Sequence, residues 1–370
     1  MGRRTLTADP AERAAAAERA VRSRHLHRFV GLPGTALGVN SWPARWPDRL
    51  FLRWNYWWQA HLLDCLLDAE LRAPAEIRRI TIERLVRGIR LRNLGRWTNA
   101  YYDDMAWLGL ALERAERLFG LGRPAAVGTL VDQLLAAWTA ELGGGIPWRR
   151  GDEFKNAPAN GPAAVLLART GFLDRAVATA DWIDRLLRDP ATGLIRDGAR
   201  PDDRPGADPI RIETPIYTYN QGVVLGTDLE LALRSVAGDR PAARARRLVD
   251  AVATGLAPAG VLAGLTGGDS GLFAGILARY LALVARALPG QDAASARTRA
   301  RAATLVRNSA DAAWAGAAWT ARGGRTGRAP VFAPDWGRPA RPPARRNAER
   351  DLSVQLSGWM LLEAAATLDR

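Results

Sequence analysis

Apolar residues recur at every third or fourth position through most of the chain, the spacing that places them along one face of an α-helix. Stretches rich in glycine and proline interrupt this pattern at intervals. The alternation of apolar and polar residues that is typical of a half-buried strand is almost absent. The pattern predicts twelve helices. The first seven lie at about residues 9–29, 49–71, 75–92, 103–120, 124–142, 162–169 and 173–188, and the eighth begins at residues 217–222. The last four lie at about residues 241–254, 272–288, 291–314 and 348–368.

The connections between these helices are of two kinds. Long connections dense in glycine, proline and polar residues occupy residues 143–162, 191–214 and 323–346, and the second of them holds a possible hairpin near Ile195. Polar and aromatic connections precede the even-numbered helices, whereas connections into odd-numbered helices are mostly short. This difference indicates that the even-numbered helices all start on the same side of the domain. Such an arrangement predicts a ring of six helical hairpins in a single domain, and a two-domain helical bundle is the alternative.

The composition is that of a folded protein, because 48% of the 370 residues are hydrophobic. The formal charge of +14 comes from arginines spread through nearly every segment, so we do not expect nucleic acid as a partner. No run of 18 apolar residues predicts a membrane span, and no apolar stretch follows the N-terminal arginine pair as in an export signal. We expect a cytoplasmic monomer, or a secreted protein if a leader is missing, with residues 1–8 disordered.

Two adjacent carboxylates, Asp103 and Asp104, are the first candidates for chemistry, and Tyr102 and Trp107 flank them. Burial of a carboxylate among aromatic rings is costly unless it is paired or hydrogen-bonded, so this placement favours a function. At a helix start both side chains can project toward one opening, where the helix dipole stabilises an ionised carboxylate and an apolar wall favours a protonated one. Such a pair suits glycoside hydrolysis, although an isolated pair more often only complements the helix dipole.

Aromatic and amide side chains strengthen the case for a sugar-binding site. The chain has 14 tryptophans, several of them in loops or at helix starts, where an indole can stack on the apolar face of a sugar ring. Amide side chains can bond sugar hydroxyls, although each can instead be an ordinary capping residue. Lys155, the only lysine, is either a site residue or a solvated loop residue. The residues that we assign to substrate binding are Trp57, Tyr102, Trp107, Asn156, Asn160, Tyr219, Asn220, Gln221 and Asp269.

Five blocks of sequence resemble glycoside hydrolase family 76 and come in the order found in that family. The two specific blocks are YYDDMAW at residues 101–107 and YTYNQG at 217–222. The other three are WWQAH at 57–61, KNAPANGP at 155–162 and GGDSGLF at 267–273. The resemblance implies an all-α (α/α)6 barrel, in which twelve helices form two concentric layers.

The resemblance also implies an activity, the retaining and endo-acting hydrolysis of α-1,6-linked mannan or manno-oligosaccharide. Asp103 matches the nucleophile of the family and Asp104 its general acid/base. No cofactor is expected, and the three histidines lack the spacing of a metal site. The alternatives are a transglycosylase that uses the same mannan and a non-catalytic carbohydrate-binding helical protein. The Arg/Pro/Gly-rich loop at 323–346 has no counterpart in the family.

Overall fold

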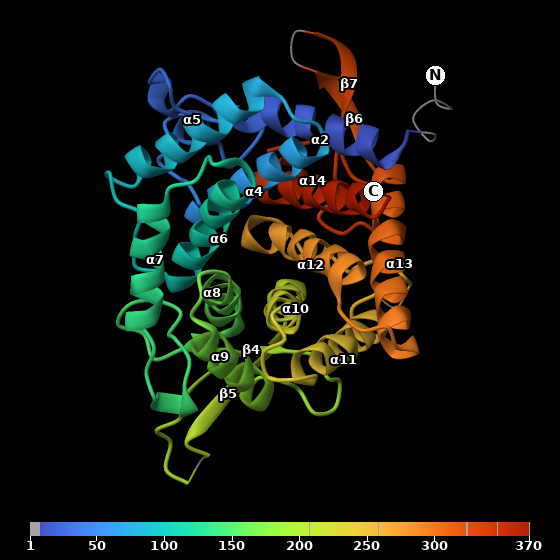
Figure 1. Ribbon diagram of the computed structural model, residues 1–370. Coiled ribbons are helices and arrows are strands. Elements are labelled where there is room, and N and C mark those ends of the chain that lie inside the picture. The colour runs from blue at the N-terminus through green and yellow to red at the C-terminus, as the bar shows by residue number, and fades with distance from the viewer. Residues whose placement is uncertain (1–7, 207, 258, 323–324, 346, 370) are drawn as a thin grey trace. The chain divides into compact units, whose positions relative to one another are not determined.

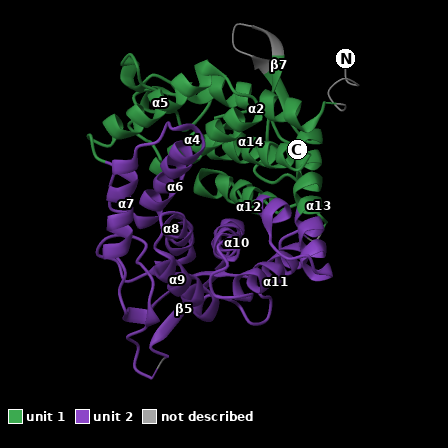
Figure 2. Cartoon of the chain, in the orientation of Figure 1, with its two compact units in different colours: residues 1–96, 259–282, 303–370 green, residues 97–258, 283–302 purple. Residues whose placement is uncertain are grey.

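Figure 1 shows the computed structural model, which describes residues 8–206, 208–257, 259–322, 325–345 and 347–369. Residues 1–7, for which we expect disorder, therefore lie outside the described residues. The chain divides into two compact units (Figure 2). Each of the twelve predicted helices has a counterpart, and an additional short helix, α3 (Trp46–Arg49), lies in a predicted loop.

The first unit comprises residues 1–96, 259–282 and 303–370. In it, α14 packs against α2 and α4, and α4 packs against α5. Two short antiparallel strand pairs accompany the helices, β1 with β2 and β6 with β7. The elements that lie wholly in this unit are α2 (Pro10–His25), β1 (Leu26–His27), β2 (Leu37–Gly38), α3, α4 (Tyr56–Arg72), α5 (Glu76–Arg92), β6 (Ala318–Arg322), β7 (Arg325–Val331) and α14 (Leu352–Thr367).

The second unit comprises residues 97–258 and 283–302. In it, α8 packs against both α6 and α10, and an antiparallel sheet has the strand order β3-β4-β5. The chain passes between the units after residues 96 and 258, and also within α12 (Phe273–Ala287) and within α13 (Ala293–Ala315). The elements that lie wholly in this unit are α6 (Tyr102–Phe119), α7 (Pro124–Ala136), β3 (Lys155–Asn156), α8 (Ala157–Arg169), α9 (Leu173–Leu186), β4 (Arg196–Pro201), β5 (Ile210–Ile216), α10 (Thr218–Leu233) and α11 (Arg240–Gly255).

Burial alternates from helix to helix, as an inner and an outer layer require. In the second unit, α8 and α10 are almost wholly buried, whereas α9 and α11 bury one face only. Gly161 lets α8 approach α10 closely, because a β-carbon there would lie 2.4 Å from Cγ2 of Val223. The stretch Gly268–Ala287 is apolar and long enough to cross a membrane by composition, but 67% of its apolar window is buried in the protein, as in a core helix.

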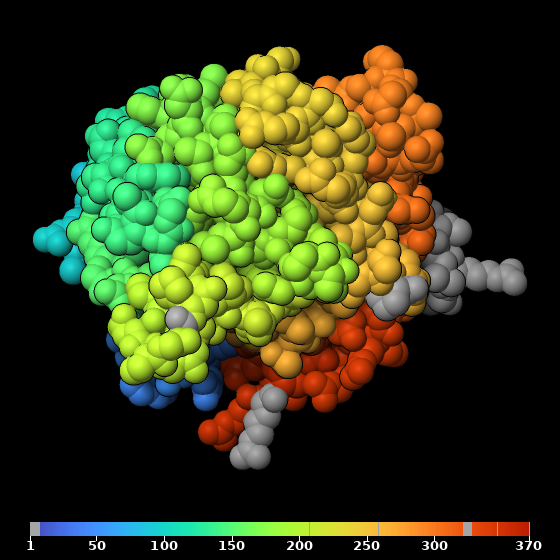
Figure 3. Space-filling view, turned by 90° about the horizontal axis from the view of Figure 1, so that it is seen from below, coloured from blue at the N-terminus to red at the C-terminus, as the bar shows by residue number. Residues whose placement is uncertain are grey.

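Three predicted loops contain regular structure. α8 begins at Ala157 and not at residue 162, because Asn156 caps it by accepting a hydrogen bond from the Ala159 N–H (3.2 Å) and Pro158 is tolerated in a first turn. The predicted loop 191–214 contains β4 and the start of β5, whose hairpin is yellow-green in Figure 3. The predicted loop 323–346 contains β7. The β4–β5 hairpin agrees with the hairpin predicted near Ile195, and Ile210 and Ile212 of β5 alternate with polar residues. β4 and β7 lack such alternation, so their backbone pairing was not visible in the sequence pattern.

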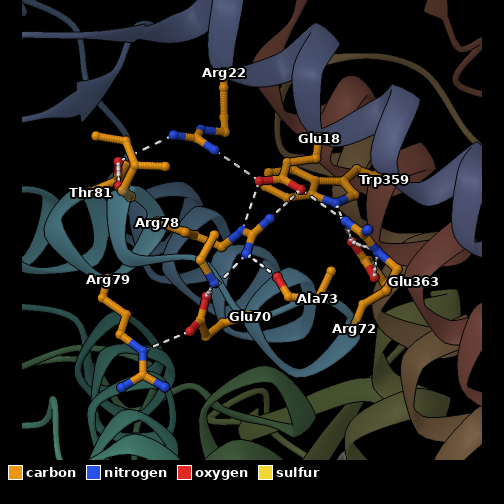
Figure 4. Close-up of polar contacts among 12 residues, drawn as sticks. Glu18, Arg22, Glu70, Arg72, Ala73, Arg78, Arg79, Thr81, Trp359 and Glu363 are labelled. Carbon is orange, nitrogen blue, oxygen red and sulfur yellow. Dashed lines mark hydrogen bonds and ion pairs between the residues drawn. The ribbon is translucent and has the colours of Figure 1, made fainter.

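A buried ion-pair network joins four helices of the first unit (Figure 4). Its centre is Arg78 on α5, whose Nε and Nη2 donate to the two oxygens of Glu18 on α2 (2.8 and 3.0 Å). Nη1 of Arg78 also donates to Glu70 on α4 (3.0 Å). Arg72 on α4 connects Glu18 to Glu363 on α14. The network therefore fixes α2, α4, α5 and α14 to one another.

Charge pairing outweighs burial at the centre of this network. Burial by itself raises the pKa of Glu18, but the hydrogen bonds and charges of Arg78 and Arg22 hold the pKa below its usual value. The Glu363 carboxyl lies deeper, and there burial dominates and raises the pKa despite its bonds to Arg72. Glu18 is bound by Arg22, Arg72 and Arg78, and Glu70 by Arg78 and Arg79, so removal of one arginine would weaken the compensation of a buried carboxylate.

The second unit contains a buried carboxyl whose protonation makes stability depend on pH. Asp228 on α10 is 1% exposed, and burial raises its pKa to about 8 although the charges of Arg244 and Arg188 oppose the shift. Between about pH 4 and pH 8 the folded chain therefore binds a proton that the unfolded chain releases, so stability falls as pH rises. From pH 5 to pH 8 we expect the stability of Asp228→Asn to rise relative to the parent by up to about 4 kcal/mol, because one bound proton corresponds to about 1.4 kcal/mol per pH unit.

Urea unfolding at several pH values measures this difference. A variant with the same pH dependence as the parent would show that Asp228 is ionised in the folded state. The matched control is Asp250→Asn, because Asp250 is exposed and its side chain pairs with Arg301 at the surface.

Candidate active site

Asp103 and Asp104 are the second and third residues of α6, whose N-cap residue is Tyr101, and both are partly buried. Asp103 accepts hydrogen bonds through both oxygens, from the Asp104 N–H at Oδ1 (2.8 Å) and from the Trp148 indole N–H at Oδ2 (3.0 Å). Asp104 accepts a hydrogen bond from the Asn99 amide (2.6 Å). Two donors and the positive end of the helix dipole favour the ionised form of Asp103.

The loop that carries Trp148 is fastened to the start of α6. The Tyr102 N–H donates to the Trp148 carbonyl (2.9 Å), and the Trp148 N–H donates to the Phe154 carbonyl (2.7 Å). The rings of Tyr101 and Trp148 pack edge to face with centroids 5.2 Å apart. These contacts hold the indole donor at a fixed place relative to the carboxylate pair.

Lys155 is neither a site residue nor a solvated loop residue. Its ammonium group donates to the Thr139 hydroxyl (2.8 Å) and to the carbonyls of Glu141 (2.6 Å) and Gly144 (2.8 Å). Burial lowers its pKa to about 8. The only lysine of the chain thus ties residues 139–144 to β3.

Two of the predicted sugar-binding amides are fully buried and bonded to the backbone. Asn160 accepts from the Ile146 N–H and donates to the Ile146 carbonyl (both 2.8 Å). Gln221 makes the same pair of bonds with Ile195 (2.8 and 2.9 Å). Because neither side chain is exposed, we withdraw both from the substrate-binding set and assign them to holding the preceding loop.

The same arrangement occurs twice in the first unit. Gln59 on α4 bonds the N–H and carbonyl of Gly38 (2.8 and 2.9 Å), and Gln355 on α14 bonds those of Phe332 (both 3.1 Å). In α4, α8, α10 and α14 alike, the amide belongs to the fourth residue of the helix. These four helices therefore share a repeated structural device, although no repeat is visible in the sequence.

Asn220 and Asn156 connect the sheet of the second unit to the starts of two helices. Asn156 caps α8 from β3, and β3 pairs with β4 so that Asn156 lies opposite Gly198. The Asn220 amide donates to Asp197 on β4 (3.2 Å). Burial raises the pKa of Asp197 although the bond from Asn220 opposes the shift. Asp197 is thus a further candidate acid.

The aromatic candidates of the second unit differ in exposure. Tyr102 and Tyr219 are partly exposed, and the Tyr219 ring lies 6.1 Å from that of Tyr217. Trp107 is only 5% exposed and packs as a core residue of α6. The structure therefore leaves the tyrosines as candidates for contact with a sugar and removes Trp107.

The first unit presents a second cluster around Asp269, whose Oδ1 accepts hydrogen bonds from Asn55 (3.0 Å) and from the indoles of Trp57 (3.2 Å) and Trp58 (3.0 Å). The Trp57 ring also packs on His61, with centroids 5.6 Å apart. A partly exposed indole that is held at its polar edge and on one side is a preformed platform for a sugar ring. We therefore expect Asp269 to orient Trp57.

The sequence interpretation missed four residues of these clusters. Asn99 precedes the specific block by two positions, and Trp148 is one of the loop tryptophans, so both carried a weak signal. Asp197 and Asn55 carried none, because their partners lie 23 and 214 residues away along the chain. Within the described part of the chain, no group of three or more His, Cys, Asp or Glu side chains is arranged to hold a metal ion.

The family model described as glycosyl hydrolase family 76 matches residues 13–336. The chain belongs to this family. No curated protein sequence matches it.

Among solved structures, the GH76A α-1,6-mannanase from Salegentibacter sp. HEL1_6 is 28% identical, with a TM-score of 0.82 over 97% of this chain and 100% of that one. An inactive variant of that enzyme, with two consecutive aspartates replaced by asparagine, matches equally well and is in complex with α-1,6-mannotriose. A protein from Listeria innocua is 26% identical, with a TM-score of 0.79 over 98% of both chains.

Membership of family 76 confirms two predictions. The fold class is all-α with the (α/α)6 barrel of the family, in agreement with the twelve long helices of the described residues. The chain is also a glycosidase.

Proposed function

We propose that this family 76 glycosidase hydrolyses α-1,6-mannosidic linkages in mannan or manno-oligosaccharides with retention of configuration. The observation that carries the proposal is the pair Asp103 and Asp104 at the start of α6, held by Trp148 and Asn99. The Salegentibacter enzyme is an α-1,6-mannanase, and its inactive variant has two consecutive aspartates replaced. A consecutive pair in this chain, at the mouth of an inner helix, is the natural counterpart.

The hydrogen bonds that the two carboxylates accept indicate a separate catalytic role for each. Asp103, with a donor on each oxygen, is stabilised as an anion and serves as the nucleophile. Asp104 donates a proton to the glycosidic oxygen while Asp103 attacks the anomeric carbon, so the glycosidic bond breaks and a glycosyl ester forms. Asp104 then takes a proton from water, which attacks the same carbon and releases Asp103. Two inversions leave the configuration unchanged.

The remaining candidates have supporting roles. In the first unit, Trp57 offers an indole face to a mannose ring, with Asp269 holding its N–H. In the second unit, Tyr102 and Tyr219 are partly exposed, and Asp197 offers a carboxyl to sugar hydroxyls. Aromatic rings can stack on the apolar faces of pyranose rings, and carboxyl groups can accept hydrogen bonds from their hydroxyls.

Incubation with linear α-1,6-mannan tests the proposal. Proton NMR during the first turnovers reports the anomeric configuration, and chromatography reports the product sizes. We expect α-configured reducing ends and shorter oligomers. β-Configured initial products would exclude retention, and oligomers longer than the substrate would identify a transglycosylase. Binding without any bond cleavage would identify a carbohydrate-binding protein.

The indole donor of Trp148 gives a prediction about positioning. We expect Trp148→Phe to lower kcat on α-1,6-mannan about tenfold with little change in KM, because the loss of a hydrogen bond to a charged group acts on Asp103 and not on the substrate. Steady-state kinetics measures the effect. Trp46→Phe changes an exposed tryptophan elsewhere and should leave kcat as it is. An unchanged kcat in Trp148→Phe would remove Trp148 from the mechanism.

A further inference from the structure

Exposed apolar side chains gather on one region of the first unit. Of the thirteen large apolar side chains that are exposed in the described part of the chain, seven lie in the segments 26–54 and 84–96. Leu94 is 86% exposed and Trp46 is 68% exposed. We name this region the basic–apolar surface, and its apolar members are Val30, Leu32, Trp46, Leu50, Leu52, Leu91 and Leu94.

Several contacts show that these two segments lie side by side, as the blue loops beside α5 in Figure 1 also indicate. Nε of Arg92 donates to the Phe51 carbonyl (3.0 Å), and the rings of Phe51 and Phe29 meet edge to face with centroids 5.8 Å apart. The Ala36 N–H donates to the Arg84 carbonyl (2.9 Å). The exposed residues next to these anchors therefore form one region and are not scattered over the unit.

The backbone holds some of these side chains outward at a cost. Val30 (φ 40°), Phe51 (φ 53°) and Leu94 (φ 55°) are three of the six non-glycine residues with positive φ in the described part of the chain. Left-handed backbone is unfavourable for a β-branched or bulky residue, for which glycine or asparagine would be less strained. Val30 and Leu94 are strained and also expose apolar surface to water, so folding alone gives no reason for either residue.

The same segments are strongly basic. They contain nine arginines and one acidic residue, Asp48, which is buried and accepts a hydrogen bond from the Ser41 hydroxyl (2.6 Å). The uniform spread of arginine along the sequence concealed this concentration. Eight of the nine are exposed: Arg28, Arg45, Arg49, Arg53, Arg84, Arg87, Arg90 and Arg96.

A cavity of about 390 Å³ opens at Arg49, and Arg24, His27 and Trp42 also line it. The Arg24 guanidinium is buried, lies 4.9 Å from the centre of the Trp42 ring, and makes its described hydrogen bonds to neutral oxygens only. A buried cation whose charge no carboxylate balances attracts an anionic group such as a phosphate. The cavity therefore adds an anion-attracting pocket beside the exposed arginines.

We propose that the basic–apolar surface docks this chain onto the surface of an anionic lipid membrane. Trp46 and the leucines enter the interface between headgroups and acyl chains, and the arginines pair with lipid phosphates. A second copy of the chain does not fit this surface, because arginine would face arginine. Nucleic acid would use the arginines but leaves Leu50, Leu52 and Leu94 without a role.

Co-sedimentation of the full chain with vesicles tests the proposal. We expect the chain to bind vesicles that contain phosphatidylglycerol, to bind vesicles of phosphatidylcholine alone weakly, and to be released by high salt. Leu94→Asn and Trp46→Ser should each lower the partition coefficient about tenfold. Because asparagine tolerates the left-handed backbone, Leu94→Asn should keep or raise the thermal midpoint, so lost binding cannot be ascribed to unfolding.

Matched controls separate this surface from exposed apolar residues in general. Ile77→Ser changes a 59% exposed residue in the first turn of α5, at the other end of the helix from Leu91, and should bind vesicles like the parent. Equal binding of parent and Leu94→Asn, equal binding to neutral and anionic vesicles, or binding of duplex DNA in place of vesicles would each overturn the proposal. Hydrolysis of soluble mannan should be unchanged in Leu94→Asn, so the result does not depend on the proposed function.

Discussion

Asp103→Asn and Asp104→Asn are each expected to lower the rate of α-1,6-mannan hydrolysis by about 10³-fold or more. An amide cannot act as the nucleophile in place of Asp103, and it cannot transfer a proton in place of Asp104. Steady-state assays with reducing-end detection measure the loss. Circular dichroism should show the helix content of the parent, because both side chains are polar, partly buried and isosteric with asparagine.

The two variants should differ on an aryl manno-oligosaccharide. Its leaving group needs no proton, so Asp104→Asn should still release the aryl group, and added azide should accelerate turnover by attacking the glycosyl ester in place of water. Asp103→Asn should neither release the aryl group nor respond to azide, because no glycosyl ester forms. Azide rescue of Asp103→Asn and not of Asp104→Asn would reverse the assignment of the two roles. Full activity in either variant would remove the pair from the mechanism.

Arg78→Met is expected to destabilise the folded chain by about 3–5 kcal/mol. The substitution removes the charged hydrogen bonds of Arg78 to Glu18 and to Glu70, which keep other arginine partners, and the loss at each buried carboxylate costs about 1.5–3 kcal/mol. Arg78→Lys should lose less, because lysine keeps the charge but cannot bond both oxygens of Glu18 as the guanidinium does. Urea unfolding measures both differences.

Arg301→Met is the control for this prediction. The pair of Arg301 with Asp250 is exposed, so its removal should change stability by about 1 kcal/mol or less. If Arg78→Met were as stable as Arg301→Met, the network of Figure 4 would contribute no more than surface charges do.

The proposed catalytic pair could be found in the sequence because its chemistry is local. Asp103 and Asp104 are neighbours, and a helix start places both at one opening whatever the rest of the chain does. The roles of the predicted sugar-binding amides, in contrast, could not be found in the sequence. Asn160 and Gln221 occur in family blocks, but only their backbone partners, Ile146 and Ile195, reveal that they hold loops and do not face a ligand.

The helices could be predicted from the amino-acid sequence, since apolar residues recur with the helical period within a few turns. The family could be recognised there too, because its blocks consist of adjacent residues. The contacts between side chains that are far apart in the sequence could be found only in the folded chain. Trp148 reaches Asp103, Asp197 reaches Asn220, and Arg78 reaches Glu18 because folding fixes distances that no local pattern encodes. Such contacts depend on loop closure and backbone pairing between distant segments, and that is why the strands other than the predicted hairpin, the positioning residues and the basic–apolar surface emerged from the structure alone.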